Sequence, residues 1–453
     1  MSSVLADSHG NSVTLQDASS LGALNDFVEG FISCEARAVN ILRIADTDHS
    51  PVVQACCAAL HMFAETRQAP SNARPYLTRA LAGATDRSQA NPREQRFVAC
   101  IAAWVNNDTP RAIQLHEEQA REFPRDLASV KLGQYHLFNR GDAAGMLRLA
   151  LASLPAAGDV PYLHGMAAFA WEQNNLMEQA ESAARKAVQM CRKEPWAHHA
   201  LAHVMLTTGR IAEGQAFMAD VSPTWTGLNS FMVTHNWWHQ ALFAIELGQH
   251  DEALRLYDGQ VWGVDKSYSQ DQINAVSLLA RLELCGADVG ERWQELADYL
   301  AARLDDHVLP FLDMQYLYGL ARAGRPEATC LLRNIEGFTA VGEQSNRIWH
   351  ELCAPASRGL LAHARGDYAL ALEELGPTLP GLVQIGGSHA QRDLFGQIQL
   401  DALMHCGRWR EAQDLLQAQL ANQPESLRLK RLADRLQAHL AARRAQSPAA
   451  GQV

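Results

Sequence analysis

Apolar residues recur along most of the chain at the spacing of one helical face. In one representative stretch they fall at Tyr162, Met166, Phe169 and Ala170, and in the next at Leu176, Ala180, Ala183, Ala184 and Ala187. Spacings of three and four residues are typical of amphipathic helices. Two such runs separated by a short polar reversal predict a pair of antiparallel helices. Since no stretch sustains an alternation of β-branched and polar residues, the predicted fold class is all-α.

The reversals between helices recur at nearly regular intervals. The first four, Asn107, Gly141, Asn175 and Gly209, are evenly spaced. The signal continues, at somewhat longer intervals, at Gly248, Gly286, Gly324, Gly366 and Gly407. Glycine and asparagine suit a reversal because the residue just past a helix end often adopts a left-handed conformation. The interval between the first four matches the period of the tetratricopeptide repeat, roughly 34 residues, so the sequence predicts a tetratricopeptide-like α-solenoid of helix-turn-helix repeats.

The repeats also predict how the chain is organised. We expect three regions: an N-terminal helical cap region at 1–90, the helical repeat array at 91–444, and a disordered tail of small and polar residues at 445–453. Within the cap region, the pattern predicts helices at 24–45 and 51–67, with the second closed by the polar residues at 70–72.

The charge balance excludes some partners. The chain has 39 Lys and Arg against 50 Asp and Glu, a formal net charge of −11. Nucleic acids and anionic membranes select basic surfaces, so we expect neither as a partner. No run reaches the roughly 18 to 20 apolar residues that span a bilayer, and the first residues do not resemble a secretion signal. The nine cysteines are scattered without a Cys-x-x-Cys pair, so we expect a cytoplasmic protein with reduced thiols.

Histidine provides the first candidate site. Two pairs at i and i+4, His199 with His203 and His235 with His239, lie in the first helices of consecutive repeats. This spacing places both imidazoles on one face of a helix, as two ligands of a single metal ion require. The first helices of stacked hairpins line one concave surface, so we expect the four rings to converge.

Other residues on first helices extend this candidate site. The functional interpretation is a divalent transition metal such as zinc, held by the four paired histidines and completed by His164, Glu172 or Asp271. Glu172 or Asp271 would then be the catalytic candidate, acting as a base toward a metal-bound water. The alternative is that the imidazoles bond helix ends or an acidic partner, and that Trp196, Trp237 and Trp238 are core residues. Neither pair has the Glu of the zincin motif after its first His.

A second candidate lies at 385–393. Gly386 and Gly387 ahead of a helix start could present N–H groups to an anion, with Arg392 adding positive charge. Ser388 with Gln391 three residues later is also a capping box, which needs no ligand and is the interpretation we favour. Taken together, the candidate ligand-binding residues are His164, Trp196, His199, His203, His235, Trp238, His239, Asp271, Gln391, Arg392 and Asp393.

Several short motifs follow one another along the middle of the chain. They are 163–169 around His164, Trp196 with His199 and His203, the segment 235–239, and 386–388 followed by 390–393. With these motifs the sequence resembles the tetratricopeptide repeat protein 38 family from about residue 160 to 400. The resemblance implies a repeat fold and carries no established reaction. The chain departs from the family at Trp171-Glu172, where the family often has paired glutamates, and at Gln315, where it has a histidine.

Two functions remain open from the sequence. One is a His- and Trp-rich concave pocket that binds a small molecule or a metal and could be catalytic. The other is a non-catalytic scaffold that binds a peptide or protein partner in the solenoid groove, which is an analogy at the level of fold. Tryptophan and histidine are bulky and amphipathic with few rotamers, which favours a defined small cavity over an open peptide groove.

Overall fold

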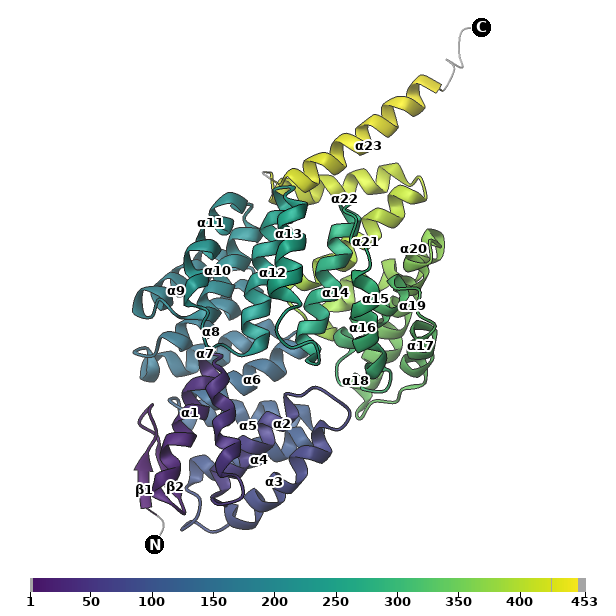
Figure 1. Cartoon of the computed structure of the whole chain (residues 1–453). Helices are drawn as coiled ribbons and strands as arrows, with labels where there is room; N and C mark the ends of the chain where they lie inside the picture. Colours follow the sequence, from purple (N-terminus) through teal and green to yellow (C-terminus); the bar gives the residue numbers. More distant parts are fainter. Residues whose placement is uncertain (1–2, 425, 447–453) are drawn as a thin grey trace.

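The structure is a computed structural model that describes residues 3–424 and 426–446, and it is almost entirely helical (Figure 1). The first hairpins of the array are α4 (Pro92–Val105) with α5 (Thr109–Glu122), α6 (Leu127–Asn139) with α7 (Ala143–Ala157), α8 (Pro161–Gln173) with α9 (Met177–Met190), and α10 (Pro195–Thr207) with α11 (Ile211–Val221). The next are α12 (Ser230–Glu246) with α13 (His250–Leu256), α14 (Ser269–Leu284) with α15 (Arg292–Leu300), α16 (Pro310–Arg322) with α17 (Glu327–Gly337), α19 (Ala354–Ala364) with α20 (Tyr368–Leu375), and α21 (His389–His405) with α22 (Trp409–Asn422). The chain is therefore a tetratricopeptide-like α-solenoid.

All nine predicted reversal residues separate the two helices of a hairpin. Each has a positive φ, ranging from 59° at Asn175 to 85° at Gly286. A side chain with a Cβ atom clashes in this left-handed region, and glycine and asparagine tolerate it best. The predicted repeat register is thus confirmed. The longest interval, before Gly366, holds the additional helix α18 (Glu343–Ile348) and a π-helical turn at Trp349–Cys353.

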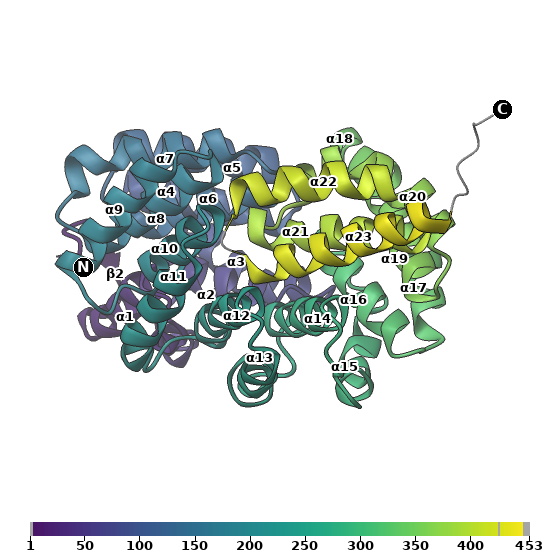
Figure 2. The same cartoon turned by 90° about the horizontal axis from the view of Figure 1, so that it is seen from above.

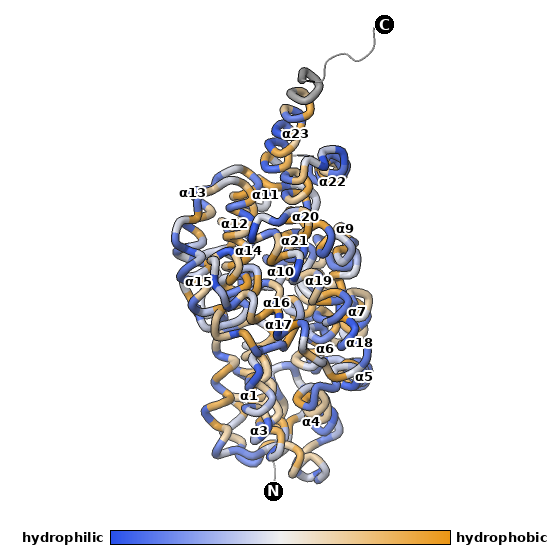
Figure 3. Tube along the Cα trace, turned by 90° about the vertical axis from the view of Figure 1, so that its right-hand side faces the viewer, coloured by the Kyte–Doolittle hydropathy of each residue, from blue (hydrophilic) through white to orange (hydrophobic). Residues whose placement is uncertain are grey.

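The two helices of each hairpin occupy different layers. First helices such as α10, α14 and α16 are buried around most of their circumference, as expected for helices inside a fold. Second helices bury a narrow stripe, which in α9 consists of Ala180, Ala184 and Ala187. Figure 3 shows hydrophilic stretches on outer helices such as α9 and α22. Side chains on the first helices therefore face the interior of the superhelix.

The N-terminal region differs from its prediction in two places. The expected helix at 24–45 is α1 (Leu21–Ile32), a break where Cys34 has a φ of 59°, and a 3₁₀ helix at Ala36–Ile44. After α2 (Pro51–Met62), residues 70–72 open α3 (Ala69–Ala84) instead of closing a helix. Proline is well tolerated in the first turn because its missing N–H has no partner there.

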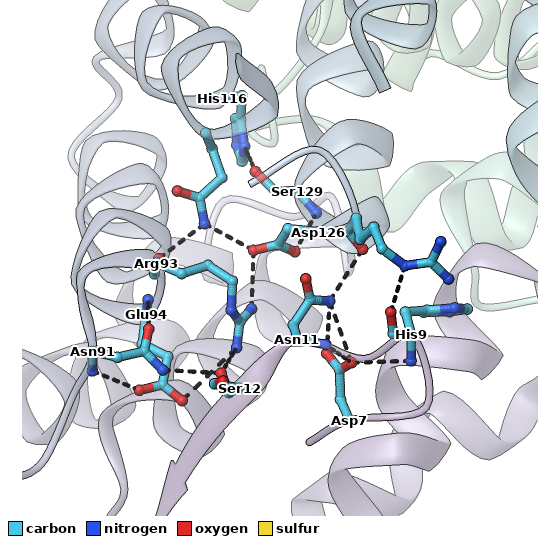
Figure 4. A network of polar contacts seen from close by, with 12 residues as sticks. Asp7, His9, Asn11, Ser12, Asn91, Arg93, Glu94, His116, Asp126 and Ser129 are labelled. Carbon is cyan, nitrogen blue, oxygen red and sulfur yellow. Dashed lines mark hydrogen bonds and ion pairs between the residues drawn. The ribbon is translucent and has the colours of Figure 1, made fainter. Parts of the chain in front are cut away.

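A short antiparallel hairpin, β1 (Ser3–Ala6) with β2 (Ser12–Leu15), precedes the helices and was not predicted. Strands of four residues are too short to show a sustained alternation. Figure 4 shows the polar network that holds the hairpin against α4 and α6. Glu94 Oε1 accepts from Thr14 N at 2.8 Å, and Arg93 Nη1 donates to Asp126 Oδ2 at 3.0 Å. Arg93 also donates to Ser12 O at 3.2 Å.

The curvature of the superhelix brings repeats that are far apart in the sequence into contact. Arg281 Nη2 of α14 donates to Ala390 O of α21 at 2.6 Å. The last helix, α23 (Leu427–Gln446), packs against α12, and Figure 2 shows the yellow C-terminal helices alongside α12 and α14. There Arg428 Nε donates to Glu246 Oε1 at 2.6 Å, with both side chains buried. These contacts close the concave face on its C-terminal side.

Two further predictions concern the C-terminal tail and membrane-spanning helices. The tail predicted from residue 445 falls mostly on residues 447–453, which lie outside the described part, while α23 runs to Gln446. Within the described ranges, we find no helix that combines the length and the apolar character needed to cross a bilayer.

Replacing Arg428 with methionine leaves the buried Glu246 carboxylate without its cation. We expect the free energy of unfolding to fall by about 3 kcal/mol, because an unpaired buried charge is strongly unfavourable. The double variant Glu246→Gln with Arg428→Met removes both charges and should regain most of that loss. Chemical denaturation followed by circular dichroism measures both variants. An R428M variant as stable as the wild type would contradict the role of the pair.

His116 of α5 gives a pH-dependent contribution to stability. It is fully buried, its Nδ1 lies 2.7 Å from Ser129 Oγ, and burial lowers its pKa to about 3. Below about pH 6.5 the His116 imidazole is protonated in the unfolded chain but stays neutral in the folded protein. The folded state therefore loses stability as the pH falls. Between pH 7 and pH 5 we expect the wild type to lose about 2 kcal/mol more than a His116→Gln variant, at roughly 1.4 kcal/mol per pH unit. Parallel denaturation curves of the two proteins across this range would contradict this.

Candidate functional site

The four paired histidines meet inside the superhelix. His199 and His203 come from α10, His235 and His239 from α12, and one ring nitrogen of each lies within 4.8 Å of all the others. His199 Nε2 is 3.0 Å from His203 Nε2 and 3.2 Å from His235 Nε2. All four side chains are buried. The convergence expected from helix register is present in the structure.

The spacing of these nitrogens suits a shared metal ion. In a tetrahedral site with zinc to nitrogen bonds of 2.0–2.1 Å, two ligand nitrogens lie about 3.3 Å apart. The separations of His199 Nε2 from His203 Nε2 and from His235 Nε2 are close to this value. Other ring nitrogens, His199 Nδ1 and both nitrogens of His239, are buried without a hydrogen-bond partner. Unpartnered buried polar atoms are costly, and on His239 a metal bond would satisfy one of them.

Burial keeps the imidazoles in the form that binds metal. Burial, followed by repulsion from neighbouring rings, lowers the pKa of His199 and His239 well below the usual value. Burial also lowers the pKa of His235 to about 3, despite its hydrogen bond to Asn274. A neutral imidazole keeps a nitrogen lone pair for a metal, so these three rings are ready to bind at neutral pH.

Polar partners orient two of the rings. His235 Nδ1 donates to Asn274 Oδ1 of α14 at 2.9 Å, which leaves the Nε2 lone pair toward the cluster. His203 Nδ1 lies 3.4 Å from Glu172 Oε1 of α8, within ion-pair distance but without hydrogen-bond geometry. A hydrogen-bonded histidine such as His235 is usual around a bound metal, because the outer partner fixes the tautomer and raises the basicity of the ligand nitrogen.

Glu172 connects the cluster to the far end of the array. Its carboxylate is fully buried, and Oε1 also lies 3.6 Å from His389 Nδ1 of α21. Burial alone would raise the pKa of Glu172, but contacts with His203 and His389 outweigh burial and hold the pKa below its usual range. The carboxylate is therefore ionised, and it places a negative charge directly behind His203.

Aromatic rings pack around the imidazoles. Trp238 stacks on His235 with a centroid distance of 5.1 Å and an interplanar angle of 10°. Trp196 lies 4.7 Å and Phe169 lies 4.9 Å from the His199 ring. These rings restrict the rotamers of the histidines and give the cluster an apolar surround, in which charge interactions are stronger than in water.

A cavity of about 470 Å³ lies beside the cluster. His199 and His235 line it, whereas His203 and His239 lie behind them. Most of its wall is apolar, with aromatic side chains from Phe31, Phe63, Phe138, Phe169, Trp196, Phe231 and Phe311. The wall includes cap residues from the segments 31–42 and 60–65, so the cap covers part of the concave face. The volume is in the range of pockets that bind small molecules.

The structure does not bring all predicted residues to this cavity. Trp196 and Gln391 line it, and Trp238 supports the cluster from behind. Asp271 is buried outside the cavity wall, where Oδ1 accepts from Thr234 Oγ1 at 2.9 Å. Burial raises the pKa of Asp271 to about 7. It is thus near the cluster without contacting a cluster histidine.

Three other candidates have structural partners instead. His164 Nε2 donates to Gly158 O at 2.9 Å, because this position of α8 faces the preceding loop and not the cluster. Arg392 donates to the carbonyls of Gly386 and Gly387, so its guanidinium is held by its own loop. Asp393 Oδ2 accepts from Gln397 at 2.5 Å.

The favoured interpretation of the segment at 385–393 is confirmed. The Ser388 side chain accepts from Gln391 N at 3.3 Å, and Gln391 Oε1 accepts from Ser388 N at 2.8 Å. Both halves of the capping box are present, so side chains of this helix start satisfy two of its backbone donors.

Sequence reasoning missed several residues of the site. Asn274 could have been found, since it precedes the reversal at Gly286 by almost the same interval as His235 precedes the reversal at Gly248. Cys34, Glu65 and Lys131 of the cavity wall carry no local signal. They become neighbours only because the cap region folds onto the concave face.

Comparisons with known proteins give little beyond this geometry. No family model matches the chain. Among solved structures, one described as Naa15/Naa10 bound to HypK-THB is similar with 12% sequence identity and a TM-score of 0.25, over 93% of this chain. The alignment spans 66% of the length of that chain. The function is therefore argued from the site itself.

Proposed function

We propose that the protein binds a divalent transition metal at His199, His203, His235 and His239, and that this centre serves a small-molecule cavity. The observation that supports this most directly is that four buried nitrogens, from two consecutive helices, lie within 4.8 Å of one another. Imidazole ligands suit zinc, iron, copper and nickel. We also propose membership of the tetratricopeptide repeat protein 38 family, on the motifs around these residues.

The ligand count bears on whether the centre is catalytic. Four histidines fill the tetrahedron that zinc prefers in structural sites, whereas catalytic zinc keeps one position open. An ion that accepts six ligands would keep two positions for a substrate or water. Because His199 and His235 border the cavity, an open position on that side would face the bound small molecule. A metal there would act as a Lewis acid.

A peptide scaffold is the weaker proposal. A groove-binding solenoid needs an open concave face, and here the cap region and α21 both contribute to the wall of the cavity. Contacts such as the one between Arg67 N and Asp306 Oδ1, at 3.0 Å, join the cap region to the middle of the array. An extended peptide would have to displace this cover, while a small molecule fits beneath it.

Metal content tests the proposal directly. Protein purified without chelators should contain about one transition-metal ion per chain, measured by inductively coupled plasma mass spectrometry. His235→Ala and His239→Ala should each lose most of it, because each removes one of four ligands. His350→Ala, at an exposed histidine in the π-helical turn at Trp349–Cys353, is the matched control and should keep its metal. Absence of a stoichiometric metal from the wild type would overturn the proposal.

Glu172→Gln tests the carboxylate behind His203. The substitution keeps the shape and removes the charge, so His203 becomes a less basic ligand. We expect metal affinity to fall about 10- to 100-fold, measured by competition with a chromophoric chelator. Glu178→Gln, at an exposed glutamate on α9, is the control and should match the wild type. An unchanged affinity in E172Q would assign Glu172 a purely structural role.

A further inference from the structure

A lysine without an ion-pair partner stands in the wall of the same cavity. Lys131 Nζ of α6 donates to Phe31 O at 2.9 Å and Ile32 O at 3.1 Å, the last carbonyls of α1. It also lies 2.9 Å from Cys34 Sγ. Among the described residues no carboxylate lies within salt-bridge distance of this ammonium. Lys131 and Cys34 both line the cavity.

The nearest acidic side chains are engaged elsewhere. Glu35 is bound by Arg37 at 2.7 Å and by Lys193 at 2.6 Å. Glu194 accepts from the backbone N–H of Ala197 at the start of α10, and burial raises the pKa of Glu194 to about 8. The charge of Lys131 acts to lower this pKa, but neither carboxylate forms an ion pair with Lys131.

Two aromatic rings border the half-buried ammonium. Nζ lies 5.4 Å from the Phe31 ring and 5.4 Å from the Trp196 ring. Burial raises the pKa of Cys34, so the sulfur next to the lysine is a thiol and not a compensating anion. A charge in apolar surroundings is normally paired, which leaves the pairing of Lys131 to a ligand. A thiol is a weak acceptor, so the N–H directed at Cys34 is the easiest to redirect.

We propose that the cavity binds a small amphipathic monocarboxylate, whose carboxylate pairs with Lys131 and whose apolar body lies across Trp196 toward His199. Trp196 lies between the two polar ends, 4.7 Å from the His199 ring and 5.4 Å from Lys131 Nζ, so a ligand that spans this one indole ring reaches both. The position of the second end of the ligand, beside the metal, rests on the proposed function. The carboxylate end does not.

The charges of the cavity favour a single anionic group. Among the described residues of the wall, Lys131 supplies the one ammonium, while Glu35, Glu65 and Asp265 supply carboxyl groups. The hydroxyl of Tyr135 is already used, since it donates to Glu65 Oε1 at 2.9 Å. A phosphate or dicarboxylate would bring further negative charge toward these side chains. One carboxylate matches one lysine, and the aromatic wall matches an apolar body.

The experiment compares each acid with its neutral alcohol. The probes are dodecanoate with dodecan-1-ol, and 4-phenylbutanoate with 4-phenylbutan-1-ol, measured by isothermal titration calorimetry below aggregating concentrations. The wild type should bind at least one of the acids about tenfold or more tightly than its alcohol. Lys131→Met keeps a stem of similar length and should bind acid and alcohol alike. Lys131→Arg keeps the charge and should keep the preference.

Each outcome bears on the proposal. A wild type without an acid preference, or a K131M variant that retains it, would overturn the proposal. Binding of the alcohol by K131M, with unchanged thermal unfolding, shows that the cavity is intact, so loss of the preference there supports a direct pair. If K131M binds neither probe or unfolds at lower temperature, its cavity is damaged and Lys131→Gln is measured in its place. Loss of the acid preference in an intact K131Q supports the proposal, and its retention overturns it.

The metal is followed in the same samples. If the preference disappears in His235→Ala but persists in K131M, the carboxylate binds the metal and the proposal is overturned. If wild type purified without chelators holds no metal and still prefers the acid, the lysine pair is supported and the metal centre is overturned. If the wild type holds one metal ion per chain but shows no acid preference, the lysine pair is overturned and the metal centre is not.

Discussion

The left-handed reversal after each first helix is the constraint on which the rest of the structure depends. Nine such residues, with φ between 59° and 85°, set where one helix of a hairpin ends and the next begins. This keeps the first helices in the inner layer and in register. Because His199 and His239 lie ten and nine residues before their reversals, the two helices present their imidazoles to the same point. The candidate metal centre is thus a product of repeat geometry.

The inner layer could not hold so many polar groups unless they were paired or neutral. Burial keeps His199 and His239 uncharged by lowering their pKa. Glu172 remains ionised because contacts from His203 and His389 keep its pKa low. Lys131 donates hydrogen bonds to the last two carbonyls of α1, and the dipole of that helix also favours a cation at its C-terminal end. These pKa shifts and hydrogen bonds allow titratable side chains to lie on the inner face of the solenoid.

What the sequence predicted follows from local rules, and what it missed depends on contacts over long distances. Reversals and i,i+4 histidine pairs depend on a few neighbouring residues, so the repeat register and the convergence of four rings could be anticipated. The contact of Lys131 with the end of α1 joins residues about 100 positions apart, and no periodicity indicates it. His164 shared the helix type of the other histidines, but its position on α8 directs it to Gly158. The four-residue strands were too short to register as a pattern.

The contact between Glu172 and His389 has a consequence for how the molecule folds. In an open solenoid each repeat touches only its neighbours, so stability is nearly a sum over adjacent pairs and an end can fray independently. Here a carboxylate of the third hairpin and an imidazole of the ninth meet at 3.6 Å, behind a histidine of the fourth. Loss of the C-terminal hairpins would therefore loosen a site built by helices much earlier in the chain. The contact couples the folding of hairpins that a linear repeat would keep independent of one another.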